Sequence, residues 1–177
     1  TPGPADRLVF DLDPGEDVGM AQLCTVARAV RDLMADIGLR VYPLTSGSKG
    51  LHLYAPLSGV SSSGAATLAH QVAVQLERAM PDQVTATMTR SVRAGKVFVD
   101  WSQNNAAKTT IAPYSLRGRE FPTVAAPRTW EEIDDPDLRQ LRYDEVLARV
   151  ANYRVNGVAR ADSVPAATPA LESRCDF

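Results

Sequence analysis

Two aspartates, Asp11 and Asp13, stand one residue apart at the end of an apolar run, and Asp100 ends a second apolar run. On a β-strand, carboxylates two positions apart project side by side, so their mutual repulsion must be offset. A Mg²⁺ or Mn²⁺ ion does this, because hard cations prefer oxygen ligands. With Asp100 added, two such ions about 4 Å apart could clamp an in-line phosphoryl displacement. The sequence therefore predicts that these three aspartates are metal ligands and catalytic residues.

An Asp-x-Asp pair is also typical of a helix cap, a turn or a solvated strand edge. Here the residues before the pair are Leu8, Val9 and Phe10, which favour a buried strand. Carboxylates without a partner are costly in such a strand. Burial of the strand is thus the observation that favours a metal site over the simpler explanations.

A loop of small residues, 45–50, carries Lys49 and is followed two positions later by His52. Small residues let backbone N–H groups approach a phosphate, and Lys49 adds positive charge. The loop is not a P-loop, because Ser48 stands where a P-loop has glycine and the next element is predicted to be a strand. A flexible surface turn is the alternative interpretation.

Positive charge is concentrated between residues 90 and 119, where six basic residues and one acid give +5 in a chain of net charge −2. Such a stripe in an acidic protein indicates an anionic ligand at one face, although a solvated loop with chance charge would look the same. Arg117 and Arg119 could match phosphate oxygens with their guanidinium forks. Arg93 and Lys108 are the candidates for contact with a nucleic-acid backbone.

The pattern of apolar residues predicts an α+β fold with the element order β-α-β-β-α-β. The predicted elements are strands at 8–13, 40–44, 51–55 (ended by Pro56) and 97–100, and helices at 20–37 and from a cap in 61–63 to Pro81. This is the ferredoxin-like or RRM-like module of many polymerase palms, with both helices on one face of a mixed sheet. A further strand at 109–116 and helices at 130–133 and 143–150 would complete a module of residues 1–150. The Ala-, Pro- and Ser-rich residues 151–177 are expected to form a disordered tail.

Side-chain parity predicts which residues meet on the other face. Leu8, Phe10 and Leu12 would face the helices, which leaves Asp11 and Asp13 on the open face. The first strand of this fold usually lies between the third and the last. His52 and Asp100 are therefore expected to flank the aspartate pair from opposite sides.

The bulk composition is that of an ordinary globular protein. The 177 residues suit one domain, with 45% hydrophobic and 23% charged residues. The two cysteines fit neither a zinc site nor a disulfide framework, and no apolar run approaches the roughly 20 residues that span a membrane. A cytoplasmic location is the expectation.

Four motifs occur in an order that resembles a known family. They are Phe-Asp-Leu-Asp-Pro at 10–14, Thr-Ser-Gly-Ser-Lys-Gly-Leu-His at 45–52, Val-Phe-Val-Asp-Trp at 97–101 and Ala-Pro-Tyr-Ser-Leu-Arg-Gly-Arg at 112–119. Over residues 1–150 the chain resembles the polymerase domain of the bacterial end-joining ligase, ligase D, of the mycobacterial type. That domain belongs to the archaeo-eukaryotic primase superfamily.

The resemblance implies a template-dependent nucleotidyltransferase that fills gaps in non-homologous end joining, a DNA repair pathway. It implies a preference for ribonucleotides, Mn²⁺ or Mg²⁺ as cofactor, DNA ends and NTP or dNTP as ligands, Ku and a ligase domain as partners, and a place at the nucleoid. The resemblance also gives site residues: Asp11, Asp13 and Asp100 for the metals, and Ser46, Lys49, His52, Arg117 and Arg119 for the triphosphate.

Two other functions remain open on the sequence. The family domain has a substantial part before the Asp-x-Asp strand, so this chain is expected to be a partial domain and could be an inactive remnant that binds DNA or nucleotide. A haloacid-dehalogenase-type phosphatase also has Asp-x-Asp after an apolar strand. That class usually has Thr or Val where Gly15 stands, and it needs a doubly wound parallel sheet.

Overall fold

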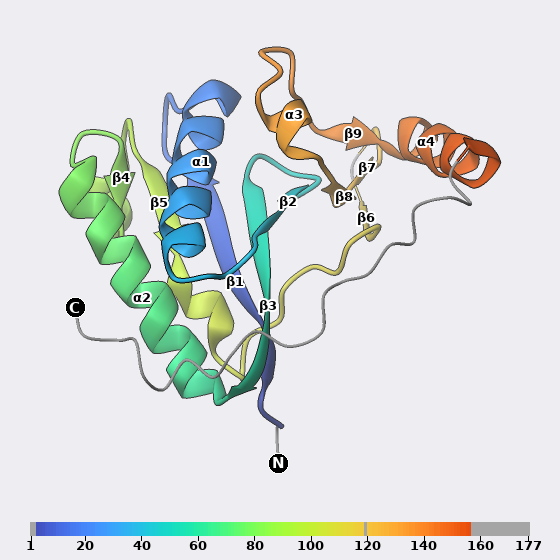
Figure 1. Ribbon diagram of the computed structural model, residues 1–177. Coiled ribbons are helices and arrows are strands. Elements are labelled where there is room, and N and C mark those ends of the chain that lie inside the picture. The colour runs from blue at the N-terminus through green and yellow to red at the C-terminus, as the bar shows by residue number, and fades with distance from the viewer. Residues whose placement is uncertain (1–2, 119, 157–177) are drawn as a thin grey trace.

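The first strand lies inside a six-stranded sheet, and two helices cover one face of that sheet (Figure 1). The computed structural model describes residues 3–118 and 120–156. The strand order is β4-β5-β1-β3-β2-β8, so β1 lies between β3 and β5 as predicted. The bounds are β1 Ala5–Pro14, β2 Tyr42–Thr45, β3 Leu51–Val60, β4 Val84–Thr85, β5 Val97–Asp100 and β8 Ala126–Pro127.

The covering helices are α1 (Met20–Asp36) and α2 (Ser62–Ala79). Each presents a stripe of buried residues to the sheet, where Leu8, Phe10 and Leu12 of β1 are fully buried. Burial of each such side chain contributes roughly 1.5–3 kcal/mol. Gly38, with φ of +79°, ends α1, which is the cap that the sequence predicts. The α+β fold with both helices on one face is confirmed.

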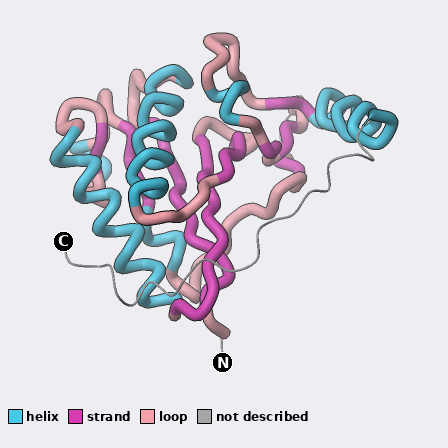
Figure 2. Tube along the Cα trace, in the orientation of Figure 1, coloured by secondary structure: helices cyan, strands magenta, loops and turns pink. Residues whose placement is uncertain are grey.

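A second, small sheet lies at the other end of the molecule (Figure 2). It has the order β6-β7-β9, and α4 packs near it. The remaining bounds are β6 Leu116–Arg117, β7 Thr123–Val124, β9 Leu141–Arg142, α3 Trp130–Ile133, α4 Tyr143–Asn156 and the 3₁₀ turns η1 Arg90–Val92 and η2 Trp101–Asn104. The sequence did not predict this sheet, because its strands of two residues carry no alternation that could be recognised.

Several predicted boundaries were wrong. The strand predicted at 109–116 is an irregular segment that joins β6 only at Leu116. Pro56 does not end β3, because it pairs with Arg7 of β1. On its other side β3 pairs with β2 only as far as Tyr54, so Pro56 lies on a free edge of the strand. A proline, which has no N–H, is tolerated at a strand edge. Helix α4 continues to Asn156, beyond the predicted end at 150. The predicted disordered tail lies outside the described residues from 157 onward.

Two further findings bear on the class of protein. Both neighbours of β1 are antiparallel to it, which excludes the doubly wound parallel sheet of a haloacid-dehalogenase-type phosphatase. Within the part of the chain that the structure describes, no helix is long and apolar enough to cross a membrane.

Candidate active site

The open face of the large sheet brings three aspartates together on two adjacent strands. Asp11 of β1 is the cross-strand partner of both His52 of β3 and Asp100 of β5. Asp13 follows on the same face of β1. We call Asp11, Asp13 and Asp100 the carboxylate cluster. Parity predicted this arrangement, and the register of the two ladders confirms it.

Neighbouring polar groups hold two of the three carboxylates. His52 Nε2 lies 3.1 Å from Asp11 Oδ1. Gln103 Nε2 lies between the strands, 3.4 Å from Asp11 Oδ2 and 3.3 Å from Asp100 Oδ2. Asp100 Oδ1 accepts hydrogen bonds from the N–H and hydroxyl of Ser102, at 2.9 and 2.5 Å. These contacts hold the Asp11 and Asp100 carboxylates in the conformation seen in the structure.

Asp13 has an unfavourable electrostatic position. Loss of hydration, together with the negative charges of Asp11 and Asp100, raises the pKa of Asp13 to about 6, although the residue keeps an exposed surface. The positive charges of His52 and Arg93 act in the opposite direction. A carboxyl group whose ionised form is disfavoured by two like charges gains most from a nearby cation.

Arg93 reaches the cluster because its loop packs against the end of β1. Its guanidinium lies 3.6 Å from the centre of the Phe98 ring, and Phe98 is the cross-strand partner of Asp13. Close packing of this loop requires glycine at position 15, since a Cβ there would lie 1.7 Å from the Arg93 carbonyl oxygen. Lys108 approaches from the other side, with Nζ 3.8 Å from Asp100 Oδ2 and bonded to Ser102 Oγ. Both predicted DNA contacts thus also neutralise the carboxylates.

The donor chemistry of the cluster fits a divalent cation, but the side chains do not yet surround one. In residues 3–118 and 120–156, no three histidine, cysteine or acidic side chains converge around a common ion position. The oxygens of Asp11 and Asp100 point to His52, Gln103 and Ser102 instead. The three carboxylates nevertheless offer only oxygen ligands, which Mg²⁺ and Mn²⁺ prefer.

His52 is fixed at both ring nitrogens. The Tyr54 hydroxyl donates to the Ile111 carbonyl at 2.8 Å, so its oxygen can accept from His52 Nδ1 at 3.2 Å. Only 4% of the His52 surface is exposed. Its predicted position beside the aspartates is confirmed, while its contact with a triphosphate stays a prediction.

The segment of residues 45–50, which we call the Lys49 loop, begins at the last residue of β2 and leads into β3. Most of its backbone amides are already used inside the protein: Ser46 N–H donates to the Gly50 carbonyl, and Ser48 and Gly50 N–H both donate to Ser46 Oγ. The sequence had suggested that these amides could approach a phosphate. In the structure they are already bonded within the protein. The loop therefore offers mainly side chains, above all that of Lys49, for the predicted phosphate contact.

Ser46 and Arg117 have clear structural roles in the loop. Ser46 is buried and its hydroxyl oxygen accepts the two amide bonds, so only the hydroxyl proton is left to donate to a ligand. Arg117 Nε donates to the Ser46 carbonyl at 3.1 Å. Arg119 lies outside the described residues. Contact of these three residues with a triphosphate remains a prediction.

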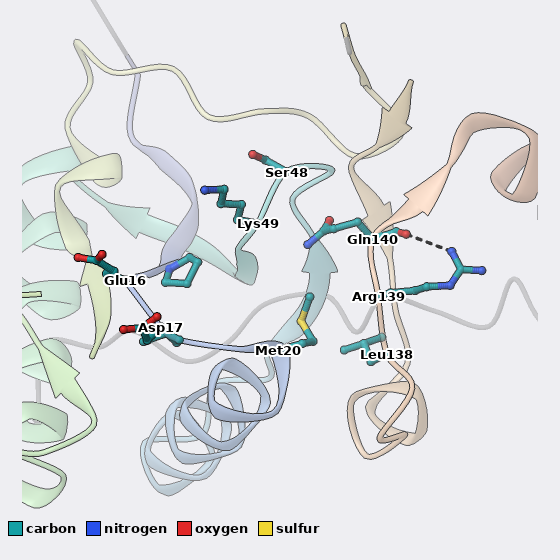
Figure 3. Close-up of a pocket in the computed structure, with 11 residues that line it drawn as sticks. Glu16, Asp17, Met20, Ser48, Lys49, Leu138, Arg139 and Gln140 are labelled. Atoms are coloured by element: carbon teal, nitrogen blue, oxygen red, sulfur yellow. Dashed lines mark hydrogen bonds between the residues drawn. The ribbon is translucent and has the colours of Figure 1, made fainter. Parts of the chain in front are cut away.

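A cleft of about 690 Å³ opens beside the Lys49 loop (Figure 3). The end of β1 and the start of α1 form one wall, with Glu16, Asp17 and Met20. Ser48 and Lys49 form the second wall, and Leu138, Arg139 and Gln140 the third. The cleft is large enough for a nucleotide-sized group, but none of the three clustered aspartates lines it.

The sequence analysis did not identify Ser102 and Gln103, which contact the carboxylates. It also did not identify Asn104, which bonds the backbone of β1. Asn104 accepts from Val9 N–H and donates to the Val9 carbonyl, both at 2.8 Å. The spacing of Asp100 and Ser102 is typical of an aspartate that caps a turn, which could have indicated the first residue. Nothing in the sequence indicates the contacts of Gln103 and Asn104, because they depend on the packing of η2 against β1.

Comparison with known proteins gives a consistent set of relatives. A family model described as "LigD, primase-polymerase domain" matches residues 1–155. The chain is 75% identical over 151 residues to the multifunctional non-homologous end joining DNA repair protein LigD of Mycobacterium tuberculosis, and 72% identical over 152 residues to LigD of Mycolicibacterium smegmatis. These matches cover 85% of this chain and 20% of each relative, so the chain spans about one fifth of their length.

A solved structure agrees with the sequence matches. The polymerase domain from Mycobacterium tuberculosis ligase D, in complex with DNA, aligns with a TM-score of 0.84 at 74% sequence identity. The alignment covers 86% of this chain and 53% of that one. The chain therefore matches about half of the solved domain.

Proposed function

Because the chain belongs to the LigD primase-polymerase family, we propose that it is the catalytic module of a DNA-directed nucleotidyltransferase that extends DNA ends in non-homologous end joining. The proposed module comprises residues 1–150. The relatives are named for end joining, and the solved relative is a polymerase domain bound to DNA. The same proposal includes the preference for ribonucleotides that the family implies. It also includes contacts with Ku and a ligase domain, and action at the nucleoid.

The observation that carries the proposal is the carboxylate cluster on the open face of the sheet. Three carboxylates on adjacent strands, one with a pKa raised to about 6, form an arrangement whose repulsion a cation would relieve. We assign Asp11, Asp13 and Asp100 as the ligands of Mg²⁺ or Mn²⁺. When bound, two such ions supply the positive charge that lowers the pKa of an attacking hydroxyl and stabilises the leaving pyrophosphate.

The protein's own residues would bind and orient the nucleotide. Lys49, on the wall of the cleft, supplies a charge for the phosphates, and Arg117 and Arg119 are proposed to add guanidinium contacts. Ser46 and His52 complete the proposed triphosphate set. His52 also contacts Asp11 at 3.1 Å and would help to orient that carboxylate.

The primer and template would approach along the basic side of the cluster. Arg93 lies near Asp13, and Lys108 lies near Asp100. Once cations neutralise the carboxylates, the two basic side chains could bind DNA phosphates instead. Contacts with phosphates would make DNA affinity fall steeply with salt. A flat salt response would contradict this assignment.

Substitution of Asp13 by alanine tests the proposal directly. We expect Asp13→Ala to abolish Mn²⁺-dependent addition of a ribonucleotide to a primed gap, while Asp36→Ala, at the exposed end of α1, keeps wild-type extension. Unchanged extension in the Asp13 variant would contradict the assignment. Wild-type protein that binds DNA or nucleotide in a gel shift but adds no nucleotide would instead identify a binding remnant.

A further inference from the structure

One side chain from the second half of the chain spans the Lys49 loop. Gln140 stands just before β9, some ninety residues after the loop in sequence. Its Oε1 accepts from Gly47 N–H at 2.7 Å, and its Nε2 donates to the Gly50 carbonyl at 2.9 Å. Figure 3 shows the Gln140 side chain extended toward the loop that carries Ser48 and Lys49. One amide group therefore ties the tip of the loop to its end.

The loop needs such a tie because its composition does not fix its conformation. Gly47 has φ of +70°, a region that glycine enters freely and other residues avoid. Gly50 sits so close to β1 that a Cβ would lie 2.4 Å from the Leu12 carbonyl oxygen. Hydrogen bonds between Ser46 and Gly50 close the loop from within, and Gln140 adds the contact that holds Gly47 at its tip.

Two other described residues of the same region brace the loop at single points. Arg117 Nε donates to the Ser46 carbonyl, and Thr123 Oγ1 donates to the Gly47 carbonyl. Each of these contacts holds a single point. Gln140 fixes the distance between two points that lie on either side of Ser48 and Lys49.

We infer that Gln140 is a positioning residue for nucleotide binding: it holds the loop so that Lys49 projects toward the triphosphate in the cleft. The inference rests on the proposed function of Lys49. Both polar atoms of the Gln140 side chain are used on loop backbone, so it acts through the loop. A displacement of about 1 Å in a group that positions substrate is sufficient to weaken its contact with that substrate.

The test compares the same substitution at two glutamines. Gln140→Met keeps the length of the side chain and removes both hydrogen bonds, and Gln75→Met makes the same change on the exposed side of α2. Calorimetric titration with ATP in the presence of Mn²⁺ measures affinity. Gap filling gives KM and kcat, and amide hydrogen exchange follows Gly47 N–H.

We expect Gln140→Met to bind ATP about tenfold more weakly than Gln75→Met, because only about a tenth of the loop population would keep the conformation that presents Lys49. KM should rise by a similar factor while kcat at saturating nucleotide stays near wild type, because the carboxylate cluster is untouched. Gly47 N–H should exchange faster. A Gln140→Glu variant keeps the acceptor for Gly47 N–H but faces the Gly50 carbonyl with a carboxylate, so it should protect Gly47 and still weaken ATP binding.

Equal ATP affinity and KM in Gln140→Met and Gln75→Met would overturn the inference while leaving the proposed function intact. A fall in melting temperature with no change in ATP affinity would also overturn it, since Gln140 would then be structural only. If wild-type protein does not bind ATP at all, the proposed function fails first and the inference with it. The two failures are thus distinguished by the wild-type titration.

Discussion

The carboxylate cluster and the Lys49 loop lie next to each other, yet they are built in different ways. The cluster stands on β1 and β5, where backbone ladders fix the register and alternation directs the side chains. The Lys49 loop has no ladder at its tip, and side chains from the second half of the chain hold it. The backbone of the cluster is therefore set by the sheet, whereas the conformation of the loop depends on side chains from other segments.

This difference suggests that the two parts of the site can be disturbed separately. Changes in the cluster should act on the chemical step, because they alter charge at the reacting centre. Changes in the loop or in its braces should act on nucleotide affinity. The predictions below would break or sharpen that distinction, and they run from the largest expected effect to the smallest.

The largest effect is expected for Asp100→Asn. The amide oxygen can still accept from Ser102 N–H, so the start of η2 is kept while one negative charge is lost. The transition state would lose several kcal/mol of stabilisation by the cations, which corresponds to about a thousandfold lower kcat in gap filling. Thermal unfolding serves as the control: a variant that melts near wild type and keeps its kcat would refute the role of Asp100.

A smaller effect is expected for Lys49→Ala. Loss of one charge-assisted contact to a phosphate should raise the KM for nucleotide by roughly 10- to 100-fold and change kcat little. Arg78→Ala, near the end of α2 and exposed, is the matched control for loss of a positive charge. If Lys49→Ala lowered kcat and left KM alone, the division between binding loop and reacting cluster would be wrong.

The smallest effect is a dependence of stability on pH. The pKa of Asp13 in the folded state, about 6, is above the value of about 3.9 that is usual for aspartate. Between these values the folded state binds more protons than the unfolded state, so stability without metal should fall as pH rises. Asp13→Asn should show a weaker fall in urea unfolding between about pH 4 and about pH 6. An equal change of unfolding free energy with pH in the two proteins would contradict the electrostatic account of the cluster. Added Mn²⁺ should reduce the difference in pH dependence between them.

The sequence was sufficient to predict the parts of the site that lie on elements with a periodic pattern of apolar residues. Alternation in β1 and β5 predicted which residues share the open face, and the register of Asp11 with His52 and Asp100 confirms it. The helical stripe and Gly38 predicted α1. These features could be predicted because local sequence determines them.

The sequence was not sufficient where single side chains meet across long separations. Gln103 between Asp11 and Asp100, Asn104 on Val9 and Gln140 on the Lys49 loop all depend on the packing of short irregular segments. Two-residue strands such as β7 leave no periodic signal. The loop amides were predicted to face a phosphate, but Ser46 Oγ accepts two of them, a local competition that composition alone does not reveal.

The central claim, that Asp11, Asp13 and Asp100 form a divalent-cation site, is tested most directly by titrating the protein with Mn²⁺ and following free Mn²⁺ by electron paramagnetic resonance. The account predicts saturable binding by the wild-type protein that is weakened in Asp13→Ala and in Asp100→Asn and unchanged in Asp36→Ala. Binding that is equal in all four proteins, or undetectable in the wild type with nucleotide present, would contradict it.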